Sequence, residues 1–237
     1  MPTFTLDLQV AAGADDCSFD GPSWAINVTR TYFNYGFSST SSYKLGGGFR
    51  FTNVTIPKGS TITTAYLKST CWTSISKSGQ KCRIYGDKEP DAAAWTTLAN
   101  YQSRRGTKVG GANDNYITTA YVSWSLPTSM TRLTEYQLPE IKTVIQEITD
   151  QDGWVSGNHL ALWVDDAWDE STHSAGTPHQ AFCYEDSNTG HAMKLHIEYV
   201  PPVWVNVKDV NGVLVTTISK LDGVLKTSIY KRNGIVA

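Results

Sequence analysis

The chain has 237 residues, of which 40% are hydrophobic, and its formal net charge at pH 7 is -2. Because no basic cluster is longer than Arg104-Arg105, we expect no binding to nucleic acid. No run approaches the roughly 18 apolar residues of a membrane-spanning helix, and the first residues lack the basic and apolar regions of a secretory signal. We therefore expect a protein that stays out of the membrane and is made in a cytoplasm, or has already lost its signal.

The composition and the first half of the chain indicate β-structure. Thr, Ser, Gly, Tyr, Trp and Val are abundant, whereas Met, Lys and Glu are scarce for a helical protein. Phe4, Leu6, Leu8 and Val10 alternate with polar residues, which is the pattern of a half-buried strand. Further strands are predicted around residues 24–30, 49–56, 61–72, 81–86 and 121–126.

Three segments among these strands do not have the pattern of a core strand. A loop rich in Gly and Asp is expected from Gly13 to Pro22, and residues 31–43 combine Tyr and Phe with Ser, Thr, Asn and Gly. The triple glycine at 46–48 precedes a strand and not a helix, so we expect a flexible turn there and no phosphate cradle.

Four cysteines are spread widely along the chain. Cys17, Cys71, Cys82 and Cys183 form no CxxC pair, so a tetra-cysteine zinc site is not expected. Cys71 and Cys82 flank a turn signal, which leaves a disulfide across a hairpin open, but buried free thiols are favoured.

The second half contains one predicted helix, over residues 139–150. Pro139 suits its first turn, and Ile141, Val144, Ile145 and Ile148 recur at helical spacing. Strands are expected at 159–166, 181–186 and 193–199, and Pro201-Pro202 then ends the sheet. We predict an all-β, antiparallel, jelly-roll-like sandwich over residues 1–200, with the helix capping one end, followed by a separate tail over 201–237.

The tail repeats itself every eleven residues. Asn211-Gly212, Asp222-Gly223 and Asn233-Gly234 tolerate the positive φ of a type I′ turn, so each predicts a β-hairpin turn. So short a repeat cannot bury its own apolar face, which makes it an assembly or attachment element, an external strap or stalk. The predicted assembly anchors are Val213, Ile218, Val224, Ile229 and Ile235.

Two acidic clusters are candidate chemical sites. Asp15, Asp16 and Asp20 could supply oxygen ligands to Ca²⁺, with solvated turn residues as the alternative. A second cluster consists of Asp165, Asp166, Asp169 and Glu170. Paired carboxylates hydrolyse glycosides only at set separations, and these four crowd one predicted loop, so we expect no enzyme.

Exposed aromatic side chains are the other candidates. Tyr32 and Tyr35 lie in the polar stretch and Trp168 in a charged loop, and all three are expected to be exposed. Flat rings flanked by small polar groups suit glycan binding, and a subunit interface is an equally good use.

Three stretches of the chain carry a family resemblance. They read FRFTNVTIPKGSTITTAYL, LPEIKTVIQEITDQDGWVSGNHLALWV and HAMKLHIEYVPP, with the motif residues Arg50-Phe51, Ile56 to Leu67, Trp154 to Leu162 and Lys194 to Tyr199. This order and spacing resemble the DNRLRE-type β-sandwich family of bacterial surface and secreted proteins, whose relatives serve as carbohydrate-binding modules. The sequence departs from the family at 192–194, where Ala-Met-Lys stands in place of a usual Pro. The resemblance implies a sandwich fold and favours a structural calcium ion near the first loop.

The tail is similar to short NGV-type repeats that end many bacteriophage and environmental viral proteins. Together with the apparent lack of a signal, this resemblance implies a non-enzymatic virion structural protein, such as a capsid decoration, head-fibre or tail-appendage component. We expect a homo-oligomer, with a trimer favoured, that docks on other virion proteins. The alternative is a carbohydrate-binding module or adhesin head that recognises a cell-surface glycan.

Overall fold

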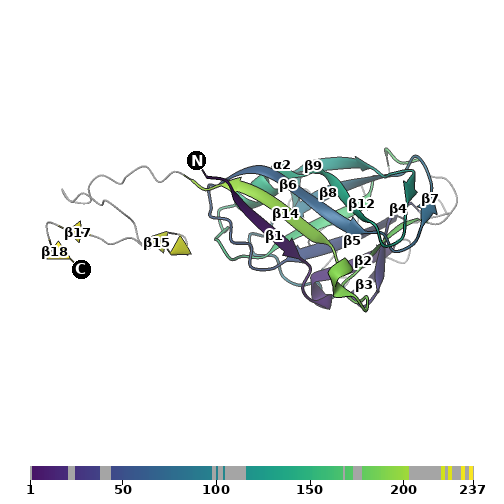
Figure 1. The fold of residues 1–237 in the computed structure, drawn as a ribbon, viewed down its shortest axis with the longest axis horizontal. Coiled ribbons are helices and arrows are strands. Elements are labelled where there is room, and N and C mark those ends of the chain that lie inside the picture. Colours follow the sequence, from purple (N-terminus) through teal and green to yellow (C-terminus); the bar gives the residue numbers. More distant parts are fainter. Residues whose placement is uncertain are drawn as a thin grey trace.

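The structure is a computed structural model that describes residues 2–20, 25–37, 44–97, 100, 104, 116–167, 169–172 and 178–202, together with four two-residue strands of the tail. The described residues form two antiparallel sheets packed face to face, with one short α-helix (Figure 1). The predicted all-β class, the antiparallel sandwich and the presence of one helix are therefore confirmed.

The smaller sheet has four strands and one face on the core. Across the sheet the order is β1 (Phe4–Gln9), β14 (Lys194–Val200), β6 (Thr61–Thr70) and β11 (Glu135–Glu140). In β14, buried Leu195, Ile197 and Tyr199 alternate with half-buried polar residues. This period of two is the pattern of a strand with one face on the core and the other toward solvent.

The larger sheet is covered on both faces along part of its width. Its main path runs β13 (His179–Phe182), β4 (Tyr32–Phe37), β5 (Lys44–Phe51), β12 (Leu160–Asp166), β8 (Lys81–Asp87) and β9 (Ile117–Ser125), with β2 (Asp16–Asp20) joined to β5 and β3 (Ala25–Asn27) to β2. All seven residues of β12 are buried. A short pair, β7 (Ile75–Ser76) with β10 (Ser129–Met130), lies outside both sheets.

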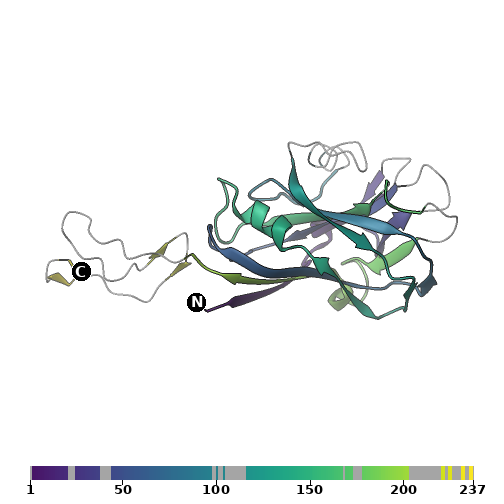
Figure 2. The same cartoon turned by 90° about the horizontal axis from the view of Figure 1, so that it is seen from above.

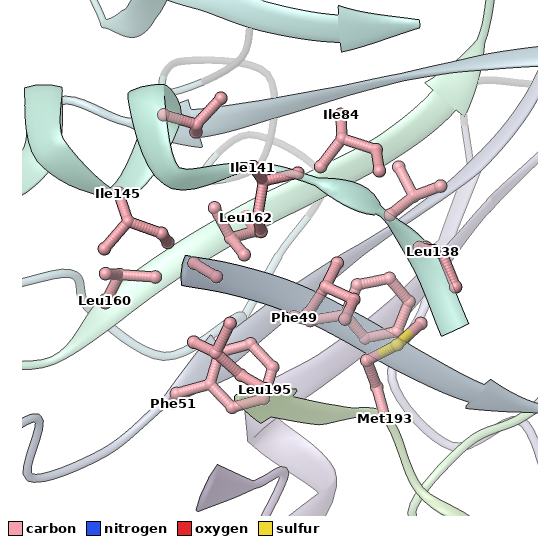
Figure 3. Close-up of a cluster of buried hydrophobic side chains, with 14 of the residues drawn as sticks. Phe49, Phe51, Ile84, Leu138, Ile141, Ile145, Leu160, Leu162, Met193 and Leu195 are labelled. Atoms are coloured by element: carbon pink, nitrogen blue, oxygen red, sulfur yellow. The ribbon is translucent and has the colours of Figure 1, made fainter. Parts of the chain in front are cut away.

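The main core lies between the two sheets. Figure 3 shows side chains from both sheets and from the helix meeting there, among them Phe51, Leu195 and Ile145. The helix α2 (Lys142–Thr149) contacts β6 of one sheet and β8 and β9 of the other, so it closes the core on this side (Figure 2). Its buried face is the one that the helical spacing predicts, because Val144, Ile145 and Ile148 are all buried.

A second, smaller core covers the outer face of the larger sheet. Trp163 of β12 and Trp95, from the segment after β8, lie with their ring centroids 5.7 Å apart. The Arg104 guanidinium lies 4.0 Å from the Trp95 ring centroid and binds the buried Asp87 carboxylate at 2.6 Å. The Trp95 ring therefore packs between Trp163 of the sheet and the Arg104 side chain, which is ion-paired with Asp87.

Three predictions about local structure were wrong. The segment expected as a loop from Gly13 to Pro22 contains strand β2. The helix begins at Lys142 and not at Pro139, which belongs to β11. Gly46, Gly47 and Gly48 are buried inside β5 and form no turn. A Cβ atom at Gly48 would lie 2.7 Å from the Trp95 ring, so glycine is needed for close packing there. The favoured free thiols are confirmed, since all four cysteines are buried and unpaired.

The described part of the tail consists of two short hairpins. They are β15 (Lys220–Leu221) with β16 (Val224–Leu225), and β17 (Lys231–Arg232) with β18 (Ile235–Val236), labelled or drawn as short arrows in Figure 1. Leu221 pairs with Val224 and Arg232 with Ile235, so each connection has two residues. The hairpins predicted at Asp222-Gly223 and Asn233-Gly234 are confirmed by this pairing, and the one at Asn211-Gly212 lies outside the described residues.

Candidate functional site

The polar aromatic stretch, which lacks the pattern of a core strand, contains strand β4, and the two faces of this strand differ. Phe33 and Tyr35 point into the core with 0% exposure, whereas Tyr32 is half-buried. Tyr35 stacks on the buried His179 ring, and its hydroxyl lies 3.5 Å from that of Ser69. The expected exposure of Tyr35 was wrong because Phe33 and Tyr35, two residues apart, share the inward face of a strand. Tyr35 thus has no ring face to offer a ligand.

Tyr32 belongs to a cluster of ring side chains, here called the aromatic ledge, that comprises Tyr32, Trp72, Phe182 and His191. The Tyr32 and Trp72 rings stack at 5.1 Å and Trp72 meets Phe182 edge-on at 4.8 Å. His191 lies 4.5 Å from Phe182. Tyr32, Trp72 and His191 are half-buried, so none of these three residues is fully enclosed.

Backbone pairing at the end of the larger sheet holds the ledge together. Phe182 pairs with Tyr32 across β13 and β4. The Trp72 amide donates to the carbonyl of Gln180 at 2.9 Å, just after an isolated bridge between Cys71 and Ala181. The ledge therefore forms where the end of β6, in one sheet, meets β13 of the other.

Polar side chains surround the aromatic ledge. The Arg30 guanidinium lies 5.8 Å from the Tyr32 ring centroid, and the Gln180 side-chain amide donates to Asn34 at 2.9 Å. Asp186 lies 3.0 Å from the His191 ring nitrogen Nδ1. Partly exposed rings beside amides and charged groups can stack on a sugar ring and hydrogen-bond its hydroxyls.

The first acidic cluster contains a buried ion pair and two carboxylates at opposite ends of one strand. Asp15 is paired with the Arg50 guanidinium, which also donates to the carbonyl of Ala92. Asp16 and Asp20 begin and end the extended strand β2, which separates their Cα atoms by about 13 Å. The Ca²⁺ site at Asp15, Asp16 and Asp20 stays a prediction. Within the described residues, no group of three potential ligands is placed to hold a metal ion.

Asp16 instead forms a carboxyl pair with Glu185. Its Oδ2 accepts the Tyr184 amide hydrogen at 2.8 Å. The pKa of Asp16 is raised to about 8, mainly by burial and in smaller part by the neighbouring Glu185 carboxyl. Burial also raises the pKa of Glu185. One shared proton can therefore hold this pair together.

The second acidic cluster is divided between a strand and a turn. Asp165 and Asp166 are buried in β12. Asp169 and Glu170 bind the Arg83 guanidinium at 2.6 and 2.7 Å, and hydrogen bonds from Arg83 lower the pKa of both carboxyls. The strand predicted over 159–166 is confirmed for Asp165 and Asp166, so the expectation that all four carboxylates lie in one loop was wrong for these two.

The structure describes only some of the other predicted residues. Val213, Ile218, Ile229 and Trp168 lie outside the described residues. Val224 and Ile235 begin the second strand of each tail hairpin. His179 is a buried residue of β13, where its ring nitrogens lie 2.7 Å from Gln80 and 3.0 Å from the Pro127 carbonyl.

Comparison with known proteins adds no relative. No protein-family model matches the chain, and no curated protein matches it. The resemblances to DNRLRE-type sandwiches and NGV-type tails therefore stay predictions. Among the described helices, none is long and apolar enough to cross a membrane.

Proposed function

We propose that this chain is a non-enzymatic structural protein of a bacteriophage virion that acts by self-assembly and docking. The observation that supports this proposal is the pairing of the tail. Among the described strands, β15 pairs with β16 and β17 with β18, and neither hairpin is part of the sandwich sheets. These four described strands therefore pair only within the tail.

A two-stranded hairpin is marginally stable by itself in water. The tail must gain stability from neighbours, and the apolar positions Val213, Ile218, Val224, Ile229 and Ile235 are the residues that would be buried against them. Other copies of the chain, in a homo-oligomer with a trimer favoured, or other virion proteins would supply that contact. The function of the protein is then to associate with other protein chains.

Deletion of residues 203–237 tests the proposal directly. Light scattering should show loss of the oligomer or of its attachment to virion components. The full-length double variant Val224→Ser and Ile235→Ser should have the same effect, whereas Thr216→Ser with Thr227→Ser, at polar positions of the same repeat, should not. A truncated protein that keeps its assembly state would contradict the proposal.

The aromatic ledge favours a second candidate function, the binding of a cell-surface glycan. Trp72 and Tyr32 present partly exposed rings, and the Gln180 and Asn34 amides lie on the same face of the sheet. On a glycan array, Trp72→Ala should abolish binding. Tyr121→Ala is the matched control because Tyr121 is an exposed aromatic residue outside the ledge. Binding that persists without Trp72, or no binding by the native chain, would exclude this role for the ledge, and EDTA would show whether a metal ion contributes.

A further inference from the structure

Strand β1 forms an open border of the smaller sheet. It pairs with β14 along one side in an unbroken register from Phe4 to Gln9. On its other side no described strand pairs with it (Figure 1). An unpaired strand edge carries a row of N–H and C=O groups that can accept another strand.

The direction of these backbone groups follows from one hydrogen bond. The Val10 amide donates to the Met193 carbonyl at 3.0 Å, on the continuation of the β1–β14 pairing. Because the direction alternates along an antiparallel strand, Phe4, Leu6 and Leu8 also bond β14, whereas Thr5, Asp7 and Gln9 present their N–H and C=O groups outward.

The β1 edge lacks the features that usually prevent edge pairing. It contains no Pro, Lys or Arg, and its one charge, Asp7, is held 2.7 Å from His196 of β14. The opposite edge of the same sheet is β11, and it has more of these features. It contains Pro139, two glutamates and a register break between Gln137 and Glu140. Charges, proline and bulges block pairing at an edge, so β11 is protected and β1 is not.

We infer that β1 pairs with β1 of a second copy of this chain across a two-fold axis. Antiparallel pairing centred on Leu6 places Leu6 opposite Leu6 of the second copy and Thr5 opposite its Asp7. The outward N–H and C=O groups of Thr5 and Asp7 then bond each other, and the apolar side chains stay on the core face. Shifting the register to centre on Asp7 would set two carboxylates opposite each other, which is unfavourable.

The same register covers exposed apolar surface. Phe4, which is 46% exposed and stacks on Tyr199, comes to lie opposite Leu8 of the second copy. One strand thus supplies both halves of a self-complementary contact, as a two-fold interface requires. This contact does not involve the tail and is therefore independent of the proposed function.

A cysteine cross-link in the full-length chain tests this interface. In the proposed register the two Leu6 Cα atoms are about 4.5 Å apart, within disulfide range. Leu6→Cys should give an interchain disulfide between the two introduced thiols under mild oxidation, identified by peptide mapping. Thr5→Cys is the control, because its two copies lie on a diagonal roughly 7–8 Å apart, and it should cross-link at least tenfold more slowly.

Proline at the edge provides a second, independent measurement. Thr5→Pro removes an outward N–H without removing a bond to β14, so the sandwich should keep its melting temperature. It should abolish the Leu6→Cys cross-link and reduce the mass of the native-sequence assembly about twofold in light scattering, whereas Thr5→Val should do neither. Cross-linking that is absent in a folded Leu6→Cys chain, equals that of Thr5→Cys, or survives Thr5→Pro would overturn the inference. Loss of the oligomer after tail deletion alone would bear on the proposed function and not on the cross-link between the two β1 strands.

Discussion

At the scale of single residues, Asp16 links folding to pH. Its folded-state pKa, raised to about 8 by burial and by Glu185, lies above the ordinary value of 3.8 expected in the unfolded chain. The folded state therefore binds more protons than the unfolded state between these two values. Its contribution to stability is complete below about pH 4 and is lost as the pH rises through about 8.

The free energy of unfolding should consequently fall between pH 5 and pH 8, by on the order of 1 kcal/mol or more from this residue. Asp16→Asn keeps a donor for Glu185 and an acceptor for the Tyr184 amide, so it should flatten that pH dependence. Urea unfolding at several pH values measures the slope, with Asp150→Asn on the exposed end of α2 as control. An unchanged slope in Asp16→Asn would assign the pH dependence to other groups.

The ion pair between Arg104 and Asp87 gives a second prediction at this scale. Both side chains are buried, and Arg104 lies against the Trp95 ring. Arg104→Ala should lower the free energy of unfolding by about 3–5 kcal/mol, because it leaves the Asp87 carboxylate buried without its cation. Chemical denaturation measures the loss. Lys58→Ala, which removes the partner of the exposed Asp152, should have a far smaller effect.

At the scale of elements, the sequence pattern predicted most of the strands but missed β4, which is enclosed on both faces and carries polar residues on one of them. β14 and β6 have one face on the core, and both were expected near their observed positions. β4 was missed because Tyr32 and Asn34 on one face are almost as enclosed as Phe33 and Tyr35 on the other. Because β4 carries polar residues among its aromatic ones, its composition resembles that of a loop and not that of a core strand.

The aromatic ledge was predictable only in part, for a related reason. Tyr32 was expected to be accessible, but its neighbours Trp72, Phe182 and His191 come from distant segments of the chain. Only the pairing of β4 with β13, and the bridge from Cys71 to Ala181, bring these rings together. No local pattern in one sequence contains that information.

Strand β5 provides a prediction at the element scale. Gly48 lies under the Trp95 ring, where an added Cβ would approach to 2.7 Å. Gly48→Ala should therefore lower the free energy of unfolding by roughly 1–3 kcal/mol, the usual effect of overpacking. Trp95→Phe removes the clashing part of the ring. The double variant should therefore lose less free energy of unfolding than the two single variants lose in total. Additive losses would show that Gly48 is needed for another reason.

At the scale of the whole molecule, the two proposals assign the chain two surfaces for self-association with different symmetry. The two-fold contact through β1 would join two copies. A bundle of tails would join one copy for each tail in the bundle, three in the favoured trimer. The tail starts directly after β14 in the sequence, and Phe4 of β1 pairs with Tyr199 near the end of β14. Together they would link pairs into larger assemblies, which suits a component of a particle.

Full-length variants should separate these two contributions. Thr5→Pro should leave the oligomer that the tail forms, and the Val224→Ser and Ile235→Ser double variant should leave the β1 dimer. The triple variant should be a monomer, because it lacks both surfaces, and only the native chain should grow with concentration beyond either single oligomer. Light scattering across a concentration series measures all four masses. If the triple variant still associates, a third surface must exist, and the half-exposed rings of Tyr32 and Trp72 would be the first place to change.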